Sequence, residues 1–288
     1  MSERHVVVSA SKGYEPGLRA LVNSWARYHD VSAYTFHLLN LNLDPDAVAH
    51  AEEVAGANVV YLTQGNGESH QNVTKIGRFG YAATLDGIVM LLDADMFFLS
   101  SAEALFDIAS AGRIVGGANG SIFGFTEAYQ RKCAIPVPLG DHIETITSVP
   151  TVLDTARYGV IWSELHRLRT TGGATECDFI LQNALIRHLG LTDRLWMIPC
   201  ATATGVHEFD LKLNTRAISR HGRILTEDGL PIITSHGKWW NEKWRAGILK
   251  NMARYARGDE RITTAAEQSA AVLYEEFQRA RDGYPDDD

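Results

Sequence analysis

The first hundred residues alternate between short apolar runs and longer amphipathic segments. The apolar runs are built from aliphatic and aromatic residues, and they cover 5–10, 34–39, 58–62 and 87–99. Runs of this length and composition favour buried strands. The segments between them repeat their apolar residues with the period of a helix and cover 15–29, 45–55 and 75–85. Strands that alternate with helices predict an α/β fold with a mostly parallel sheet.

The remainder of the chain is less regular. Helices are predicted at 102–109, 155–168 and 177–189, and strands at 113–117, 195–199 and 231–235. Residues 134–150 contain three of the eight prolines and show no period, so we expect a long functional loop there. From about residue 241 to 281 the pattern is helical. One domain with a helical C-terminal extension is the simplest organisation.

Two carboxylates, Asp93 and Asp95, interrupt the apolar run 87–99. In an extended chain residues i and i+2 point to the same side, so both side chains aim at one point near the end of the strand. Ligands bind at the carboxyl ends of strands in open α/β sheets, and two convergent carboxylates suit a divalent cation that also binds phosphate oxygens. Other acidic segments, 44–46 and 286–288, are typical of a helix start and of a solvated tail.

Two further segments carry candidate chemistry. Residues 7–17 form a strand, a short loop and a helix start, where backbone groups can bind a base edge and Tyr14 can stack on it; the alternative is an ordinary turn with Tyr14 in the core. In 234–244, His236 ends a strand, and a neutral imidazole can complete a carboxylate site, especially for manganese. Lys238 or Lys243 can neutralise a diphosphate there. Three tryptophans offer a wall for a sugar; the alternative is an aromatic-capped helix start with a surface histidine. They are Trp239, Trp240 and Trp244.

Composition narrows the class of protein. The chain has 288 residues, of which 45% are hydrophobic and 22% charged, as in ordinary globular proteins. A net charge of −8 argues against nucleic acid as the main partner. Three widely spaced cysteines form no Cys-x-x-Cys pair, which favours a reducing cytoplasm over a disulfide framework or a zinc site. We see no signal segment, and no apolar run approaches the about 18 residues of a membrane span.

Together the three segments resemble the glycogenin-like glycosyltransferases of family eight, which have the GT-A fold and include bacterial galactosyltransferases. The resemblance lies in Val-Val-Ser-Ala-Ser-Lys-Gly-Tyr-Glu-Pro-Gly at 7–17, in Leu-Leu-Asp-Ala-Asp-Met at 91–96, and in His236 followed eight residues later by Trp244. It implies a Rossmann-like GT-A catalytic domain at 1–240, with a nucleotide-binding half at 1–100 and an acceptor and sugar half at 101–240. Residues 241–288 are the helical extension.

The resemblance also implies an activity and assigns residues to it. The activity is metal-dependent transfer of a sugar, with retention, from a nucleotide-sugar (in the first place a UDP-sugar) to a small-molecule or glycan acceptor. Asp93, Asp95 and His236 would be the protein ligands of Mn²⁺ or Mg²⁺. The nucleotide would contact two further sets of residues. One set binds the base and ribose: Ser9, Ala10, Tyr14, Asp93 and Ala94. The other supplies positive charge: Lys75 or Arg78, and Lys238 or Lys243.

A further motif matches the family after the middle of the chain. Asp178 and Asn183 have the spacing of Asp-Gln-x-x-Leu-Asn, in which the aspartate orients the sugar or acceptor near the anomeric carbon, although Phe179 stands in place of Gln. We expect Asp178 to be the catalytic carboxylate, with Glu176 as the next candidate.

Two alternatives remain at this stage. A nucleotidyltransferase that makes nucleotide-sugars also uses a strand-end carboxylate pair, but usually has a glycine- and lysine-rich loop after the first strand, whereas 9–17 holds a single lysine. A non-catalytic nucleotide-sugar-binding module is the other, and loss of Asp93 or Asp95 would have favoured it.

Overall fold

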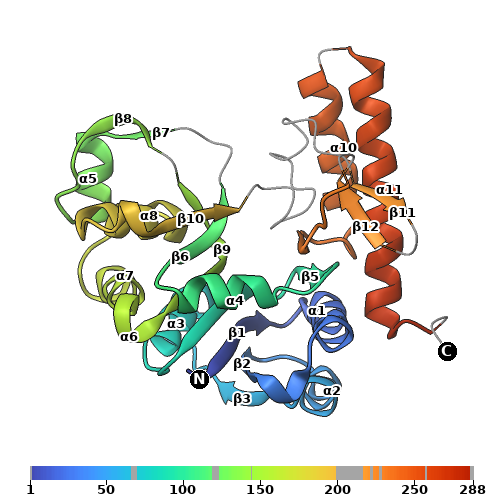
Figure 1. Cartoon of the computed structure of the whole chain (residues 1–288), viewed down its shortest axis with the longest axis horizontal. Coiled ribbons are helices and arrows are strands. Elements are labelled where there is room, and N and C mark those ends of the chain that lie inside the picture. Colours follow the sequence, from blue (N-terminus) through green and yellow to red (C-terminus); the bar gives the residue numbers. More distant parts are fainter. Residues whose placement is uncertain are drawn as a thin grey trace.

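The computed structural model is built around one seven-stranded sheet with the strand order β10-β6-β9-β4-β1-β2-β3 (Figure 1). It describes residues 2–65, 70–118, 123–143, 145–198, 217–220, 223–226, 229–256 and 258–285. The strands are β1 (Arg4–Ser11), β2 (Thr35–Leu41), β3 (Asn58–Tyr61), β4 (Ile88–Asp93), β5 (Met96–Phe98), β6 (Ile114–Ala118), β7 (Phe123–Phe125), β8 (Gly140–Ile143), β9 (Ile146–Asp154), β10 (Leu195–Ile198), β11 (Ala217–Arg220), β12 (Arg223–Thr226) and β13 (Thr234–His236).

Helices cover both faces of this sheet. They are α1 (Glu15–Tyr28), α2 (Pro45–Ala55), α3 (His70–Ala82), α4 (Glu103–Ser110), α5 (Glu127–Cys133), α6 (Thr155–Tyr158), α7 (Val160–Thr170), α8 (Asp178–His188), α10 (Glu242–Ala256) and α11 (Glu260–Asp282). On one face, α4 holds Arg4 through Asp107; on the other, Tyr81 of α3 hydrogen-bonds to His37. Because Arg4 and His5 point to opposite sides of β1, and His5 also contacts His37, these two helices lie on opposite faces.

The predicted α/β fold is confirmed. β1, β2, β3 and β4 pair in parallel, as the alternation in the first hundred residues predicts. The start of α2 at Pro45 and its end before the left-handed Gly56 follow from the fixed φ of proline and the freedom of glycine. The carboxyl ends of β1 and β4 therefore meet at the same edge of the sheet.

The predicted loop at 134–150 is wrong. It contains β8 and the first part of β9, and β9 is a central strand, antiparallel to both β4 and β6. The ladder between β6 and β9 is irregular between the pairs Gly116–Thr151 and Ala118–Ile146. Pro150 falls in this irregular stretch, where a residue without an N–H group is tolerated inside a sheet. The proline therefore marks an irregular ladder rather than the absence of a strand.

The predicted strand at 87–99 is two strands with a turn between them. β4 ends at Asp93, and β5 leaves the sheet to pair antiparallel with β13, so that His236 lies opposite Met96. The C-terminal extension forms α10 and α11, and α11 packs along α1 through a second hydrophobic cluster that includes Phe97, Trp239 and Phe277. None of the helices that the structure describes is long and apolar enough to cross a membrane. The division of the chain at residue 240 stays a prediction.

His29 makes the stability of this fold depend on pH. The amide of Ala102 donates to its Nε2 at 2.8 Å, and Nδ1 lies 3.0 Å from the carbonyl oxygen of Trp25, so the buried ring is held neutral. Burial lowers the pKa of His29 to about 4, and burial lowers that of His37 likewise. The unfolded chain then binds more protons between pH 6.5 and 4, so stability falls as the pH is lowered through this range, on the order of 3 kcal/mol for each histidine.

Urea denaturation at pH 7 and pH 4.5 checks this expectation. The variant His29→Gln should lose stability at pH 7 but show a smaller difference between the two pH values, because the contribution of His29 to that difference is then absent. An unchanged pH difference in His29→Gln would contradict the assignment.

Candidate functional site

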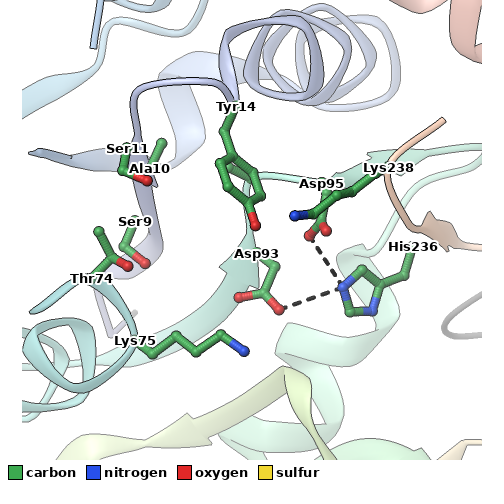
Figure 2. A pocket seen from close by; sticks show the side chains of 11 residues that line it. Ser9, Ala10, Ser11, Tyr14, Thr74, Lys75, Asp93, Asp95, His236 and Lys238 are labelled. Carbon is green, nitrogen blue, oxygen red and sulfur yellow. Dashed lines mark ion pairs between the residues drawn. The ribbon is translucent and has the colours of Figure 1, made fainter. Parts of the chain in front are cut away.

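A pocket of about 250 Å³ lies at the carboxyl ends of β1 and β4. Side chains from β1, α1's start, α3, the turn between β4 and β5, and the end of β13 surround it (Figure 2). The lining residues are Ser9, Ala10, Ser11, Tyr14, Thr74, Lys75, Asp93, Ala94, Asp95, His236 and Lys238. The structure thus brings together the three segments 7–17, 91–96 and 234–244. The first and the last of them lie more than 200 residues apart in the sequence.

Asp93, Asp95 and His236 form the polar centre of the pocket. One ligand atom from each lies within 4.8 Å of the others. His236 Nε2 lies 3.4 Å from Asp93 Oδ2 and 3.2 Å from Asp95 Oδ1. The pairing of β13 with β5 positions the imidazole, and the amide of Gly237 donates to the Asp95 carbonyl oxygen at 2.7 Å. Two carboxylates and one imidazole are a donor set that fits Mn²⁺ and, less specifically, Mg²⁺.

Arg78 of α3 lies directly behind this centre. Its side chain is completely buried and forms ion pairs with Asp93 and, at 3.2 Å, with Asp178 Oδ2 at the start of α8. Burial opposes the charge of Arg78, but Asp93 and Asp178 outweigh it and raise its pKa. Burial also favours a neutral Asp93, but the guanidinium of Arg78 and the imidazole of His236 hold the pKa of that carboxyl well below its usual range. Asp93 therefore stays ionised at neutral pH.

The two carboxylates also determine the protonation of His236. Burial lowers the pKa of the imidazole, but the charges of Asp95 and Asp93 and the hydrogen bonds to them outweigh burial and raise it to about 10. At neutral pH without a cation, His236 is thus an imidazolium between two carboxylates. A metal ion that binds here replaces this proton, because a ligating imidazole is neutral.

The structure distinguishes the basic residues that the sequence left as alternatives. Lys75 and Lys238 line the pocket and reach toward the carboxylates from opposite sides, whereas Arg78 and Lys243 do not line it (Figure 2). Arg78 is buried with its two carboxylate partners. Lys243 is exposed on the first turn of α10. Of these four basic residues, all within the described part of the chain, Lys75 and Lys238 are the two that line the pocket.

Tyr14 lies at the rim of the pocket between aromatic and cationic neighbours. The Tyr14 and Trp240 rings pack edge to face, with 5.8 Å between their centres. Lys238 Nζ lies 4.6 Å from the centre of the Tyr14 ring. Trp240 in turn stacks on Phe277 of α11 at 6.1 Å. The side chain of Tyr14 is held from behind and presents its hydroxyl end toward the carboxylates (Figure 2).

The expected sugar wall of tryptophans is not found. Trp239 is buried and donates from Nε1 to Ser235 Oγ at 3.1 Å. Trp240 and Trp244 pack against the same C-terminal cluster, and none of the three is among the described residues that line the pocket. Their rings fit because Gly17 and Gly237 lack side chains, since a Cβ on Gly17 would lie 2.5 Å from the Trp240 ring. These tryptophans hold the segment after β13 against the protein.

The residues of the predicted motif at 178–183 have two different roles. Asp178 is linked through Arg78 to Asp93 and is mostly buried, although it does not line the pocket itself. Asn183 is buried and exchanges hydrogen bonds with the backbone of Ile146, so it attaches α8 to β9. Glu176 pairs with Lys132 at 3.6 Å and, among the described residues, forms no ion pair or hydrogen bond with Arg78 or Asp93. The motif therefore supplies one residue near the carboxylate centre and one structural residue.

Sequence reasoning missed Ser11 and Thr74 as lining residues, and it missed the bridging position of Arg78. Ser11 is two residues after Ser9 on β1, so the strand period could have identified it. Thr74 precedes Lys75 on α3. The ion pairs of Arg78 join three elements and leave no local signal in the sequence.

No protein-family model and no curated protein matches the chain. Solved glycosyltransferases are similar in structure. The galactosyltransferase LgtC, in complex with donor and acceptor sugar analogs, has a TM-score of 0.55 and 16% identity over 92% of this chain and 96% of LgtC. GlyE of Streptococcus pneumoniae TIGR4 has a TM-score of 0.48 and 11% identity over 100% of this chain and 66% of GlyE. The bifunctional glycosyltransferase WbbM has a TM-score of 0.48 and 13% identity, and the match covers 69% of this chain and 39% of WbbM.

The likeness to LgtC extends over nearly the whole of both chains and rests on the arrangement of the sheet and helices. Together with the mostly parallel sheet and the C-terminal helices, it shows that this chain has the GT-A fold of glycosyltransferases.

Proposed function

We propose that this protein is a metal-dependent glycosyltransferase that transfers a sugar from a nucleotide-sugar, in the first place a UDP-sugar, to a small-molecule or glycan acceptor. One observation carries the proposal: Asp93, Asp95 and His236 converge at the carboxyl edge of a GT-A sheet, in the pocket that also holds Lys75 and Lys238. An isolated carboxylate pair would bind a cation only. The added lysines and the aromatic rim suit a cation together with a diphosphate and a base.

Each group in the pocket has a part in this proposal. Asp93, Asp95 and His236 would hold Mn²⁺ or Mg²⁺, and the bound ion would neutralise charge that develops on the departing nucleoside diphosphate. Lys75 and Lys238 add positive charge from two sides of the pocket. Ser9 and Ala10, at the end of β1, face the base together with the ring of Tyr14.

We place the sugar on the side of the carboxylate centre where Asp178 lies. Arg78 links Asp93 to Asp178, so the carboxylate of Asp178 is held at a fixed position relative to the cation site. Asp178 is the residue that we assign to orient the sugar or acceptor. Retention of the anomeric configuration is part of the proposal and rests on the family resemblance.

Thermal-shift measurements with nucleotide-sugars, with and without Mn²⁺, test the proposal directly. A ligand at 100 times its Kd adds about 2.7 kcal/mol to stability, and we expect this gain with a UDP-sugar only when Mn²⁺ is present. Without an acceptor, we also expect slow, metal-dependent hydrolysis of the UDP-sugar, which is measured as release of UDP. Pyrophosphate release from a nucleoside triphosphate and a sugar phosphate would support a nucleotidyltransferase instead, and binding without turnover would support a binding module.

Tyr14 should act through its ring. Tyr14→Phe keeps the ring and should bind UDP nearly as the parent protein does. Tyr14→Ala should weaken the free energy of UDP binding by about 1–3 kcal/mol, the usual contribution of stacking between a base and an aromatic ring. Isothermal titration of UDP with Mn²⁺ measures both variants. Equal losses in the two variants would show that the hydroxyl, and not the ring, matters.

Asp178 should affect turnover more than nucleotide affinity. Asp178→Asn should reduce turnover at least about tenfold, equivalent to about 1.4 kcal/mol in the barrier, while UDP affinity changes little. Glu176→Gln is the matched control, because Glu176 lies two residues earlier and pairs with Lys132 instead of Arg78. If Glu176→Gln loses turnover and Asp178→Asn does not, the assignment is reversed.

A further inference from the structure

A second cavity, of about 340 Å³, lies between α3, α7 and the residues that follow β3. Its described lining residues are Leu62, Thr63, Val73, Ile76, Gly77, His166, Arg169 and Thr170. On a helix with 3.6 residues per turn, Val73, Ile76 and Gly77 share one side, and Lys75 points to the other. The cavity and the nucleotide pocket therefore lie on opposite sides of α3.

Two glycines on α3 make room at this place. A Cβ on Gly77 would meet only the Leu62 side chain, at 3.8 Å, so the helix leaves open space beside it. A Cβ on Gly80 would lie 2.8 Å from the His166 ring, so the ring lies directly on the helix backbone. Glycine inside a helix is less favourable than alanine. The cavity is thus formed by residues that weaken the helix.

The cavity combines an apolar wall with basic groups. Leu62, Val73 and Ile76 supply the apolar surface, and none of the described lining residues is acidic. Arg169 Nη1 donates to the carbonyl oxygen of Glu176 at 2.5 Å, while its buried Nε has no hydrogen-bond partner. A buried donor without an acceptor is unfavourable, because it has lost its hydrogen bond to water.

The nearby acidic side chains have other partners. Glu164 pairs with Arg167 at 2.7 Å, and the carboxylate of Glu176 pairs with Lys132 at 3.6 Å. Neither is among the described residues that line the cavity. Glu176 Oε2 is buried, faces Lys132 and has no hydrogen-bond partner among the described residues. Arg169 forms no ion pair with a carboxylate in the described part of the chain, so an anion that enters the cavity would meet its charge.

We infer that this cavity is a second ligand site, which takes a small molecule made of an apolar body and one anionic group, a phosphate or a carboxylate. The apolar body packs on Leu62, Val73 and Ile76, and the anion binds Arg169 with His166 beside it. The site is independent of the nucleotide pocket, so its failure would leave the proposed transferase activity untouched.

Calorimetric titration with phenyl phosphate tests the inference, with UDP and Mn²⁺ at saturation to fill the first pocket. We expect saturable binding at least about tenfold tighter than that of inorganic phosphate, because only phenyl phosphate contacts the apolar wall. Phenylacetate replaces the phosphate by a carboxylate, and the tighter of the two ligands identifies the preferred anion. Benzyl alcohol, which has no charge, should bind at least about tenfold more weakly than the better anion.

Two variants and one control locate the binding. Arg169→Gln removes the cation and Gly77→Leu fills the cavity, and each should weaken binding at least about tenfold. Arg167→Gln, on the same helix but exposed and paired with Glu164, should bind as the parent protein does. Absence of saturable binding of both anions, or equal affinity in Arg167→Gln and Gly77→Leu, would overturn the inference, even if Arg169→Gln does not fold.

Discussion

Arg78→Met is expected to lower the free energy of unfolding by about 3–5 kcal/mol. The substitution removes the cation that lies between Asp93 and Asp178 and leaves two mostly buried carboxylates without it. Removing one member of a buried ion network is costly because the remaining charge has lost both water and its partner. Urea denaturation at pH 7 measures the loss.

Two comparisons make this expectation specific. Arg167→Met removes an exposed arginine that pairs with Glu164 and should change stability by less than about 1 kcal/mol. Mn²⁺ should restore part of the stability of Arg78→Met, because the cation neutralises Asp93 from the other side. Equal effects of the two arginine substitutions would show that Arg78 does not hold the carboxylates together.

The pocket at the ends of β1 and β4 could be predicted from the sequence because its signals are local. The end of β4 and the end of β1 are each visible as an apolar run that stops at polar residues, and parallel strands bring such ends to one edge. His236 also ends an apolar run, at 231–235. Its approach to Asp95, however, depends on the antiparallel pairing of β13 with β5, which connects residues about 140 apart and has no local pattern.

The parts that sequence reasoning missed depend on distant contacts. The first part of β9 was expected to be loop because 134–150 contains three prolines and shows no period, yet β4 and β6 enclose the strand from both sides. The period of α3 does not distinguish Lys75 from Arg78, which lie three residues apart on neighbouring faces. What separates them is α8, because Asp178 pairs with Arg78 and only Lys75 lines the pocket.

The C-terminal helices contribute to the site as well as to the core. Phe277 of α11 stacks on Trp240, and Trp240 meets both Tyr14 and the backbone of α1 at Gly17. The segment that carries His236 and Lys238 is therefore fixed between α1 and α11. This arrangement explains why three neighbouring tryptophans serve packing here, while the pocket itself is lined by smaller polar side chains.

The affinity for Mn²⁺ is expected to rise about a hundredfold between pH 6.5 and pH 8.5. The cation must displace the proton that His236 holds between Asp93 and Asp95, and the pKa of this imidazole is raised to about 10. Below that pKa one proton leaves for each metal ion bound, so the apparent affinity changes about tenfold for each pH unit. From the sequence, a histidine with its ordinary pKa predicts loss of affinity only below about pH 6.5.

Calorimetry in two buffers with different ionisation enthalpies measures both the affinity for Mn²⁺ and the number of protons released when it binds. At pH 7.5 we expect release of about one proton for each Mn²⁺ in the parent protein and close to none in His236→Ala, which should also bind the ion more weakly. His188→Ala is the control, because His188 is exposed and contacts only the carbonyl oxygen of Pro136 among the described residues. A parent protein whose Mn²⁺ affinity is flat from pH 7.5 to 8.5, without proton release, would show that His236 is neutral before the metal binds and that the carboxylates do not hold its proton.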